Sequence, residues 1–590
     1  MSVRYLAVNW NRQKRVYDAL IGVGTVASVG TFAGATLVAH PAATIETALI
    51  RGLGLTAFLI LNLILAIGPA SRLDRRWLPL LYNRRHLGVT VAILGVAHAG
   101  FAVFQYHALG NLDPIASVAA IPVAPGAIPF EWFGIAALVI LFLMAATSHD
   151  YWLSVLTPPV WKRLHMLVYP AYLALLFHLG LGFLQEERHP VYLLTLVASA
   201  LGLGLLHLVA GFQERRNDRI VPAPPPDWVD VGPADGIAEG RARIAMVAGE
   251  RVAVFRHHDQ LSAVSNVCKH QNGPLGEGRI IDGCITCPWH GYQYRPEDGT
   301  SPPPFTDSIP TFNLALVDGR VMVDPVPNPA GTLVTPVPVK PVPGERPSEF
   351  YVGYQPVAPA ATARFVRTVT AATLLLALGL MVAFAVAQRT YQNATFEFGT
   401  TRSIEGVVRT EPYPMLEVAR PGTDRVSRYI LAAGGKHGAQ AATAGLDGLH
   451  ARIEGTLAHR DNLTVLEITS ATSTGQPATL APLIGQRGGR VRLTGEIVDS
   501  KCYAGVMNPG RGTTHRACAV RCLAGGLMPL FVVTDGAGET VEMIITDAAG
   551  RPLPGVDRLA GRTVRIEGQV ERVDDLWFIR TATGEIGPTP

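Results

Sequence analysis

Two short segments near the middle of the chain combine cysteine with histidine at fixed spacing. Cys268 and His270 are separated by one residue, Cys287 and His290 by two, and sixteen residues lie between the pairs. A [2Fe–2S] cluster with mixed ligands needs two thiolates on one iron and two imidazoles on the other. One cysteine and one histidine from each of two facing loops would supply that set. A zinc ribbon or knuckle fits less well, because such sites usually use C-x2-C pairs.

The segment around these residues, from Trp228 to about Pro325, resembles the Rieske ferredoxin domain of ring-hydroxylating oxygenase systems. CPWHGYQY, which begins at Cys287, resembles its second ligand loop, and Pro302–Phe305 resembles the loop that covers the cluster. Rieske proteins of bc complexes carry a further cysteine in each ligand loop. Neither loop here has one, so the resemblance favours the ferredoxin-like type of lower potential. It implies four ligands: Cys268 and Cys287 on the ferric iron, and His270 and His290 on the reducible iron.

Four other histidines lie on two apolar stretches. His86 and His98 are twelve residues apart, and His165 and His178 are thirteen apart. At about 1.5 Å per residue, each separation is about 18–20 Å, which suits two haems stacked across a bilayer. A single intramembrane histidine could be a buried hydrogen-bonding residue, but ionisable groups at that depth are costly and usually functional. Neither pair is in angular register on a regular helix, so we expect tilt or distortion to bring the rings together.

The text around these histidines resembles the ferric-reductase-like transmembrane family over roughly residues 50–210. The resemblance rests on NRRHLGV, which contains His86, and on WKRLHMLVYPAYLALLFHLG, which contains His165 and His178. It implies two b-type haems, one held by His86 with His165 and one by His98 with His178. Ferric reductases and NADPH oxidases also carry a flavin and nicotinamide module. No G-x-G-x-x-G follows a strand here, so we expect an electron-transfer subunit without a flavin or nicotinamide domain of its own.

The remaining cysteines are Cys284 and a C-terminal group of three. Cys502, Cys518 and Cys522, with His515 nearby in sequence, could form a metal or cluster site. The plainer interpretation is one disulfide and a free or partner-bonded thiol, which an oxidising compartment would favour. Cys284 is expected to be a packed thiol.

Seven apolar stretches reach membrane-spanning length. They are expected near Ala19–Ala39, Gly52–Gly68, His86–Gln105, Trp132–Thr147, His165–Leu184, Val191–Gly211 and Phe365–Ala387. Five arginines lie between the second and third stretches, whereas Tyr106–Glu131 has neither Lys nor Arg. The positive-inside rule therefore predicts a bacterial-type inner-membrane protein whose N-terminus and Rieske segment are cytoplasmic and whose C-terminal region is periplasmic.

The expected fold is multidomain: an α-helical transmembrane bundle of six helices plus a seventh, an all-β Rieske domain, and an all-β C-terminal region. The boundaries are 1–215 for the haem bundle, 227–326 for the Rieske domain, 327–364 for a proline-rich linker, 365–387 for the seventh helix and 390–590 for the C-terminal region. Arg452–Gly455 recurs as Arg565–Gly568, and an earlier strand built around Gly406 or Gly495 precedes each copy. This repeat indicates two five-stranded, OB-like barrels.

These features predict transmembrane electron transfer between a cytoplasmic donor or the quinone pool and a periplasmic acceptor. Expected contacts are membrane lipid and a redox protein or quinone on each side. The net charge of +4 and the absence of a basic tract with interleaved aromatics exclude nucleic acid. A redox sensor or assembly protein is an alternative. A Rieske oxygenase is a weaker one, because the predicted cytoplasmic region offers no second site of two histidines and a carboxylate after His290. His450, His459 and Asp461 have the right side chains, but they are predicted to lie across the membrane.

Overall fold

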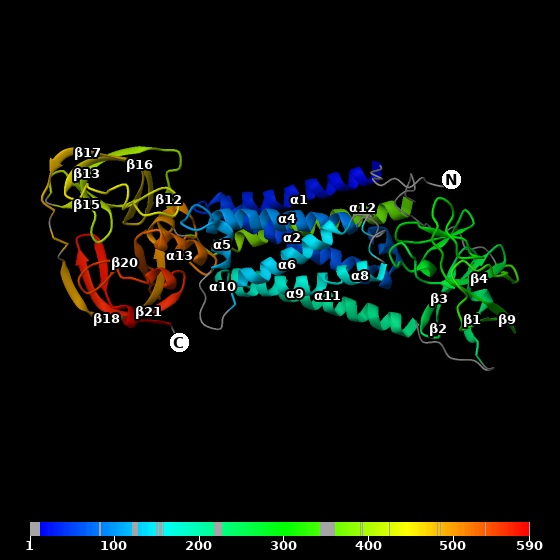
Figure 1. The fold of residues 1–590 in the computed structure, drawn as a ribbon. Coiled ribbons are helices and arrows are strands. Elements are labelled where there is room, and N and C mark those ends of the chain that lie inside the picture. Colours follow the sequence, from blue (N-terminus) through cyan, green and yellow to red (C-terminus); the bar gives the residue numbers. More distant parts are fainter. Residues whose placement is uncertain are drawn as a thin grey trace.

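A bundle of long helices separates two β regions, which lie at its opposite ends (Figure 1). The computed structural model describes residues 12–81, 84–120, 128–148, 152, 156, 158–217, 227–342, 360–389, 391, 393–423, 425–480, 482–483, 485–536 and 538–588. The main helices are α1 (Arg12–Ala39), α2 (Ile45–Leu73), α4 (Arg84–His107), α6 (Phe130–Ala146), α8 (Pro158–His165), α9 (Val168–His178), α11 (Pro190–Asn217) and α12 (Ala360–Val386).

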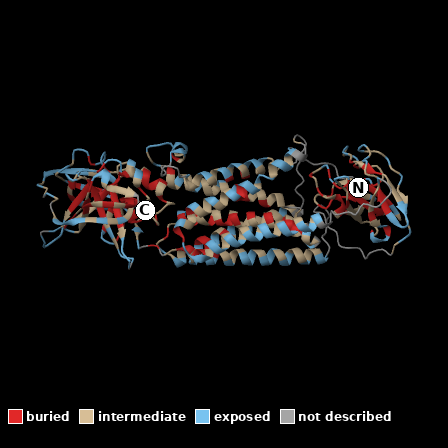
Figure 2. Ribbon diagram, turned by 90° about the horizontal axis from the view of Figure 1, so that it is seen from below, coloured by how far each residue is buried: buried red, intermediate tan, exposed pale blue. Residues whose placement is uncertain are grey.

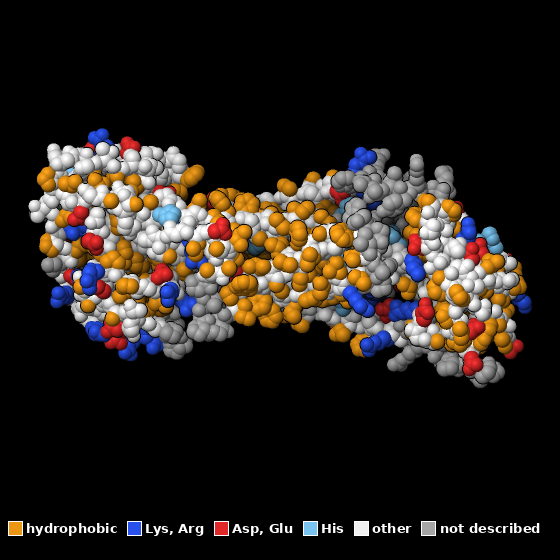
Figure 3. All heavy atoms as spheres, in the orientation of Figure 1, with side chains coloured by type: hydrophobic (Ala, Val, Ile, Leu, Met, Phe, Trp, Pro, Cys, Tyr) orange, Lys and Arg blue, Asp and Glu red, His pale blue; other side chains and the backbone are white. Residues whose placement is uncertain are grey.

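The bundle has the length and surface of a membrane domain. Within the described residues, six helical segments are long and apolar enough to cross a membrane, and α6 is apolar but has 17 residues. All seven predicted stretches lie on these helices. Hydrophobic side chains cover the middle of the molecule, whereas charged side chains gather at its two ends (Figure 3). The chain is therefore a membrane protein whose helices contact lipid.

The fifth predicted span is interrupted twice. Helix α8 ends at His165 and α9 begins at Val168, so a turn separates the two histidines of this span. After His178 the chain forms the π-helical turn η2 (Leu179–Phe183) and the short helix α10 (Leu184–Glu186). Distortion was expected between His165 and His178, and the turn provides it. Helix α4, which carries His86 and His98, is continuous.

Three small antiparallel sheets make up the Rieske domain. The first sheet contains β1 (Val229–Pro233), β9 (Leu314–Val317) and β10 (Arg320–Val323). The second contains β2 (Ala242–Val247), β3 (Glu250–His257), β4 (Gln260–Ser265), β8 (Thr311–Phe312) and β11 (Val337–Pro338). The third contains β5 (Arg279–Ile281), β6 (Cys284–Thr286) and β7 (Gln293–Tyr294). Strand β11 lies inside the stretch predicted as a linker and pairs with β4 at the sheet edge, a position that accepts proline. That boundary is thus corrected: the Rieske sheet takes in part of the proline-rich run.

Two closed barrels of one topology form the C-terminal region. Their strands are β13 (Arg402–Arg409), β14 (Met415–Ala419), β15 (Val426–Ala432), β16 (Leu449–Arg460) and β17 (Leu463–Pro477), then β18 (Gln486–Asp499), β19 (Pro529–Thr534), β20 (Thr540–Thr546), β21 (Thr563–Val573) and β22 (Leu576–Arg580). In each barrel the first three strands form an antiparallel meander, the third pairs in parallel with the fifth, and the fourth pairs with the first and fifth. The predicted OB-like barrels are confirmed.

The repeated sequence occupies equivalent strands of the two barrels. Arg452–Gly455 lies on β16 and Arg565–Gly568 on β21, each the fourth strand. A Cβ at Gly455 would lie 2.2 Å from the Glu467 carbonyl oxygen, and one at Gly568 would lie 2.6 Å from that of Arg580. Each glycine therefore lets the fourth strand close against the fifth. Figure 2 shows the resulting cores, with buried residues concentrated inside the barrels.

We expect Gly455→Ala to destabilise the first barrel by about 1–3 kcal/mol, because its methyl group would overlap a backbone oxygen that cannot move freely. Gly489→Ala is the control, since no heavy atom lies within 4 Å of a Cβ at that position. Calorimetry of the purified protein should show a lower Tm for the first variant only. Equal transitions in both variants would contradict this account of barrel closure.

Candidate functional site

The two loops that carry the predicted cluster ligands have the same backbone hydrogen bonds. In each loop the cysteine N–H donates to the carbonyl five residues later, at 2.9 Å from Cys268 and 2.8 Å from Cys287. Each cysteine carbonyl accepts from the N–H four residues later, at 2.7 and 2.8 Å. Asn272 and Gly291 occupy that fourth position and have φ values of 58° and 67°, a region that asparagine and glycine tolerate. The second ligand loop thus repeats the geometry of the first.

These loops bring the four predicted ligands together. The rings of His270 and His290 meet edge to face, with centroids 5.0 Å apart and planes at 86°. Cys268 and Cys287 are each only 1% exposed, whereas both imidazoles are half-buried. A Cβ at Gly273 would lie 2.7 Å from Cys287 Sγ, so the first loop passes directly over the thiol of the second.

The surroundings favour the uncharged forms of His290 and Cys287. Burial, followed by the neighbouring His270, lowers the pKa of His290 well below its ordinary value. Burial is also the largest cause of the raised pKa of the Cys287 thiol. A neutral imidazole is the form that binds metal, and iron would supply the positive charge that a buried thiolate requires. The four residues therefore fit a [2Fe–2S] cluster.

Aromatic residues surround this set, and one of them reaches a thiol. Tyr294 Oη lies 3.7 Å from Cys268 Sγ and accepts a hydrogen bond from the Lys269 N–H at 2.9 Å, so its own proton can point at the sulfur. The ring of Tyr292 stacks on His270 at 5.3 Å, and Phe305 packs against Tyr292 at 4.8 Å. Phe305 belongs to the predicted covering loop. Sequence reasoning did not single out Tyr294, although it is the last residue of CPWHGYQY.

A second pair of histidines meets inside the bundle. His98 of α4 and His178 of α9 have ring centroids 6.3 Å apart and planes at 88°. Two metal–nitrogen bonds of about 2 Å and two ring radii of about 1.2 Å give a centroid separation of about 6.4 Å. The observed spacing therefore accommodates one metal ion between the rings.

Matching contacts hold the two rings in place. His98 Nδ1 lies 2.9 Å from the Ile50 carbonyl oxygen, and His178 Nδ1 lies 3.0 Å from that of Phe130. Four residues after each carbonyl is a glycine: a Cβ at Gly54 would lie 3.1 Å from the ring of His98, and one at Gly134 would lie 2.7 Å from that of His178. Each carbonyl fixes the tautomer that leaves Nε2 free to bind iron.

The other two predicted haem ligands are not in ring contact with each other. His86 Nδ1 lies 2.5 Å from Asp18 Oδ1 on α1, and its ring meets Tyr17. The ring of His165 stacks on Trp161, and its buried Nε2 has no hydrogen-bond partner among the described residues. Because α4 is unbroken, twelve residues turn His86 about 120° away from His98. The structure thus brings His98 and His178 together and leaves His86 and His165 apart. We call His98 and His178 the outer pair, and His86 and His165 the inner pair.

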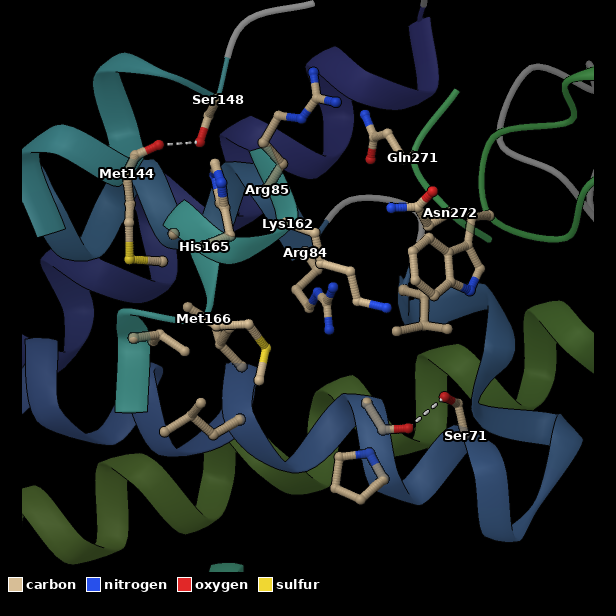
Figure 4. A pocket seen from close by; sticks show the side chains of 18 of the residues that line it. Ser71, Arg84, Arg85, Met144, Ser148, Lys162, His165, Met166, Gln271 and Asn272 are labelled. Carbon is tan, nitrogen blue, oxygen red and sulfur yellow. Dashed lines mark hydrogen bonds between the residues drawn. The ribbon is translucent and has the colours of Figure 1, made fainter. Parts of the chain in front are cut away.

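A cavity of about 370 Å³ lies between the Rieske ligand loops and the end of the bundle next to them. Figure 4 shows His165 with Arg84, Arg85 and Lys162 on the bundle side, and Gln271 and Asn272 of the first ligand loop facing them. Trp289 and His290 of the second loop also line the cavity. The predicted cluster site therefore opens towards His165.

A carboxylate connects the two sides of this cavity. Glu214 of α11 contacts Arg251 of β3 at 2.5 Å and Arg72 of α2 at 3.2 Å. All three residues line the cavity. His207, expected to be structural, also lines it and meets Tyr169 edge to face.

The C-terminal cysteines and His515 lie together in the second barrel and are buried. Cys284 is half-buried and lies on β6 of the Rieske domain, outside the ligand loops.

Comparison with known proteins identifies two parts of the chain. Residues 227–313 match the Rieske [2Fe-2S] domain family, and residues 53–176 match the ferric reductase like transmembrane component family. No family matches the C-terminal region. The ferredoxin subunit of anthranilate 1,2-dioxygenase from Burkholderia cepacia is 35% identical over 102 residues, which are 17% of this chain and 92% of that protein.

Two further relatives cover the same segment. The ferredoxin component of the alkene monooxygenase system of Xanthobacter autotrophicus is 29% identical over 104 residues, 18% of this chain and 85% of that protein. A solved complex of reduced oxygenase and oxidised ferredoxin in carbazole 1,9a-dioxygenase has a chain that is 28% identical, covering 17% of this chain and 96% of that one, with a TM-score of 0.17.

The fold and the site define a multidomain membrane protein with a redox, electron-transfer role. The chain belongs to the Rieske [2Fe-2S] family through residues 227–313, and its residues 53–176 match the ferric reductase like transmembrane component family. Its Rieske domain supports a [2Fe–2S] cluster, and the ferric-reductase-like bundle is consistent with haem.

We expect Tyr294→Phe to lower the reduction potential of the cluster by an amount on the order of 50 mV, because a hydroxyl donor to a ligand sulfur stabilises the reduced state. Tyr292→Phe is the matched control, since its hydroxyl bonds to Asp307 and not to a thiol. A redox titration followed by EPR measures both. Equal potentials in the two variants would exclude a hydrogen bond from Tyr294 to sulfur.

If His98 and His178 bind a haem, we expect Gly134→Ala to prevent its binding, because the new methyl group would overlap the ring of His178. Gly180→Ala is the control, as nothing lies within 4 Å of a Cβ there. The haem content per chain, from pyridine haemochrome spectra, should fall in the first variant alone. Unchanged haem in Gly134→Ala would show that His178 is not a ligand.

Proposed function

We propose that the chain conducts electrons across the membrane, between a donor at its Rieske end and an acceptor at its barrel end. The observation that carries this proposal is the shared cavity, in which His290 and Trp289 of the second ligand loop face His165 of the bundle. When bound, the [2Fe–2S] cluster and two b-type haems would supply one-electron oxidation and reduction. The protein's part is to hold these groups in sequence and to keep them dry.

The proposed cluster ligands are Cys268, Cys287, His270 and His290. The two thiols of this set are buried, the two imidazoles are half-buried, and His290 lines the cavity. His290 therefore provides the exit towards the bundle. Glu214 holds the domain in this position through its contacts with Arg251 and Arg72.

The proposed ligands of the outer haem are His98 and His178, supported by their separation and by the carbonyls that fix their tautomers. For the inner haem we propose His165 and His86, with the ring of His86 turning from Asp18 into the cavity next to Arg84 and Arg85. Arg84, Arg85 and Lys162 place cations around this cavity, which suits the carboxylate groups of a haem.

The proposed orientation puts the Rieske end in the cytoplasm and the barrels in the periplasm of a bacterial inner membrane. Arg72, Arg84, Arg85 and Lys162 all line the cavity at the Rieske end. At the barrel end, Glu186 and Glu187 pair with Arg389 and Arg51. An excess of basic residues at one end is typical of the cytoplasmic side. A redox protein or a quinone is the proposed partner on each side.

The proposal is tested with the full-length protein in vesicles that enclose ferricyanide and hold the protein with its Rieske domain outside. A membrane-impermeant reductant added outside should reduce the enclosed acceptor. Cys268→Ser and His98→Ala should each lower the rate to that of protein-free vesicles, because each removes a proposed cofactor ligand. Cys284→Ser should retain the rate of the unaltered protein.

Stopped-flow spectra give the second measurement. In the unaltered protein, haem absorbance should change within seconds of reduction of the Rieske domain. Reduction of haem over minutes would contradict the proposal and favour a redox sensor.

A further inference from the structure

Three thiols meet in a buried cluster that takes side chains from both barrels, and an imidazole lies beside them. Cys518 Sγ lies 3.9 Å from Cys502 Sγ and 3.8 Å from Cys522 Sγ. The ligand atoms of Cys502, His515 and Cys518 all lie within 4.8 Å of one another. The cysteines are between 1% and 5% exposed, and His515 is 1% exposed. The chain does not place these groups in the Rieske or haem sites, so they call for a separate explanation.

The sulfur separations match a shared metal ion. At a zinc–sulfur distance of about 2.3 Å, two ligands of a tetrahedral site lie about 3.8 Å apart. A disulfide would join two sulfurs at about 2.05 Å and leave the third without a role. Here the central sulfur is equally close to both others. Cys518 and Cys522 occur one helical turn apart on α13 (Arg516–Ala524), which directs both side chains to the same face.

A buried carboxylate orients the remaining ligand. Asp499 Oδ2 lies 3.1 Å from His515 Nε2, and Asp499 Oδ1 accepts the Cys502 N–H at 2.8 Å. Asp499 is 0% exposed. A carboxylate bonded to a ligating histidine is a usual second partner in zinc sites, where it fixes the ring. A single acidic side chain thus positions a ligand from each of two segments.

We propose that Cys502, Cys518, Cys522 and His515 bind one zinc ion. Four protein ligands and complete burial describe a closed site, which is the structural kind and leaves no position for a substrate.

The zinc ion would stabilise the surface through which the second barrel contacts the bundle. Arg521, next to Cys522 on α13, donates to Ser117 Oγ at 2.8 Å, and Asn508 donates to the Ala42 carbonyl at 2.8 Å. Tyr106, near the end of α4, packs against the same core as the three cysteines. The segment from Cys502 to Ala524, which includes the turn η5 (Cys502–Val506) and α13, therefore carries both the metal ligands and contacts to the segments that connect the membrane helices. Tyr106 is eight residues beyond His98, so this surface also sets how the barrel sits over the outer histidine pair.

The test uses the full-length protein, purified without added metal. Elemental analysis should find one zinc per chain, and X-ray absorption at the zinc edge should show three sulfurs at about 2.3 Å. Cys518→Ser should lose the zinc, whereas Cys284→Ser, outside the site, should keep it. Proteolysis should release the C-terminal barrel faster from the zinc-free protein.

The unaltered protein provides a measurement that does not depend on a variant folding. Titration with a mercurial reagent should release one equivalent of zinc in step with modification of the C-terminal thiols. Thiols trapped with an alkylating agent at lysis and mapped by mass spectrometry should all be reduced. A Cys502–Cys518 disulfide, iron at these ligands, or a chain without zinc would each overturn the proposal.

Discussion

The arrangement of the bundle depends on how two imidazoles are held where no water can solvate them. A buried histidine in an apolar bundle must satisfy one ring nitrogen before the other can serve a metal. Here helices α2 and α6 each supply a carbonyl and, one turn later, a glycine that lets the ring lie against the helix. The helices therefore have to pack closely at these points, and the separation of His98 and His178 follows from that packing.

At the Rieske end of the bundle, charged side chains surround the histidines, whereas backbone carbonyls hold His98 and His178. His86 is held by Asp18 and His165 by the Trp161 carbonyl, and cations line the space between helices and Rieske loops. Within the bundle, Glu214 lies at this basic surface and pairs with Arg251 of the Rieske domain. The Rieske domain is thus docked by an ion pair whose members also form the wall of the cavity.

Much of this could be predicted from sequence because cofactor chemistry restricts spacing within short segments. The two ligand loops could be located for that reason, and so could the helices that carry the four intramembrane histidines. Contacts between distant segments could not be predicted: nothing near Glu214 indicates Arg251, and nothing near Ile50 indicates His98. The linker boundary was misplaced because a proline-rich run can be a spacer or an edge strand, and only the partner strand decides. A distortion between His165 and His178 was expected, but its position at residues 166 and 167 depends on packing.

For the C-terminal cysteines, the sequence favours a disulfide, whereas the topology of the barrel favours a metal site. By sequence, Cys502 is sixteen residues from Cys518, and an oxidising compartment makes a disulfide natural. The barrel places Cys502 on a turn after its first strand and sends the chain through α13 before the second strand, so all three thiols face one another. Burial then shields the thiols from oxidants, and Asp499 supplies a carboxylate that a disulfide would not need. The same insertion contacts the ends of the membrane helices, so whatever holds the three sulfurs together also determines the position of the barrel over the bundle.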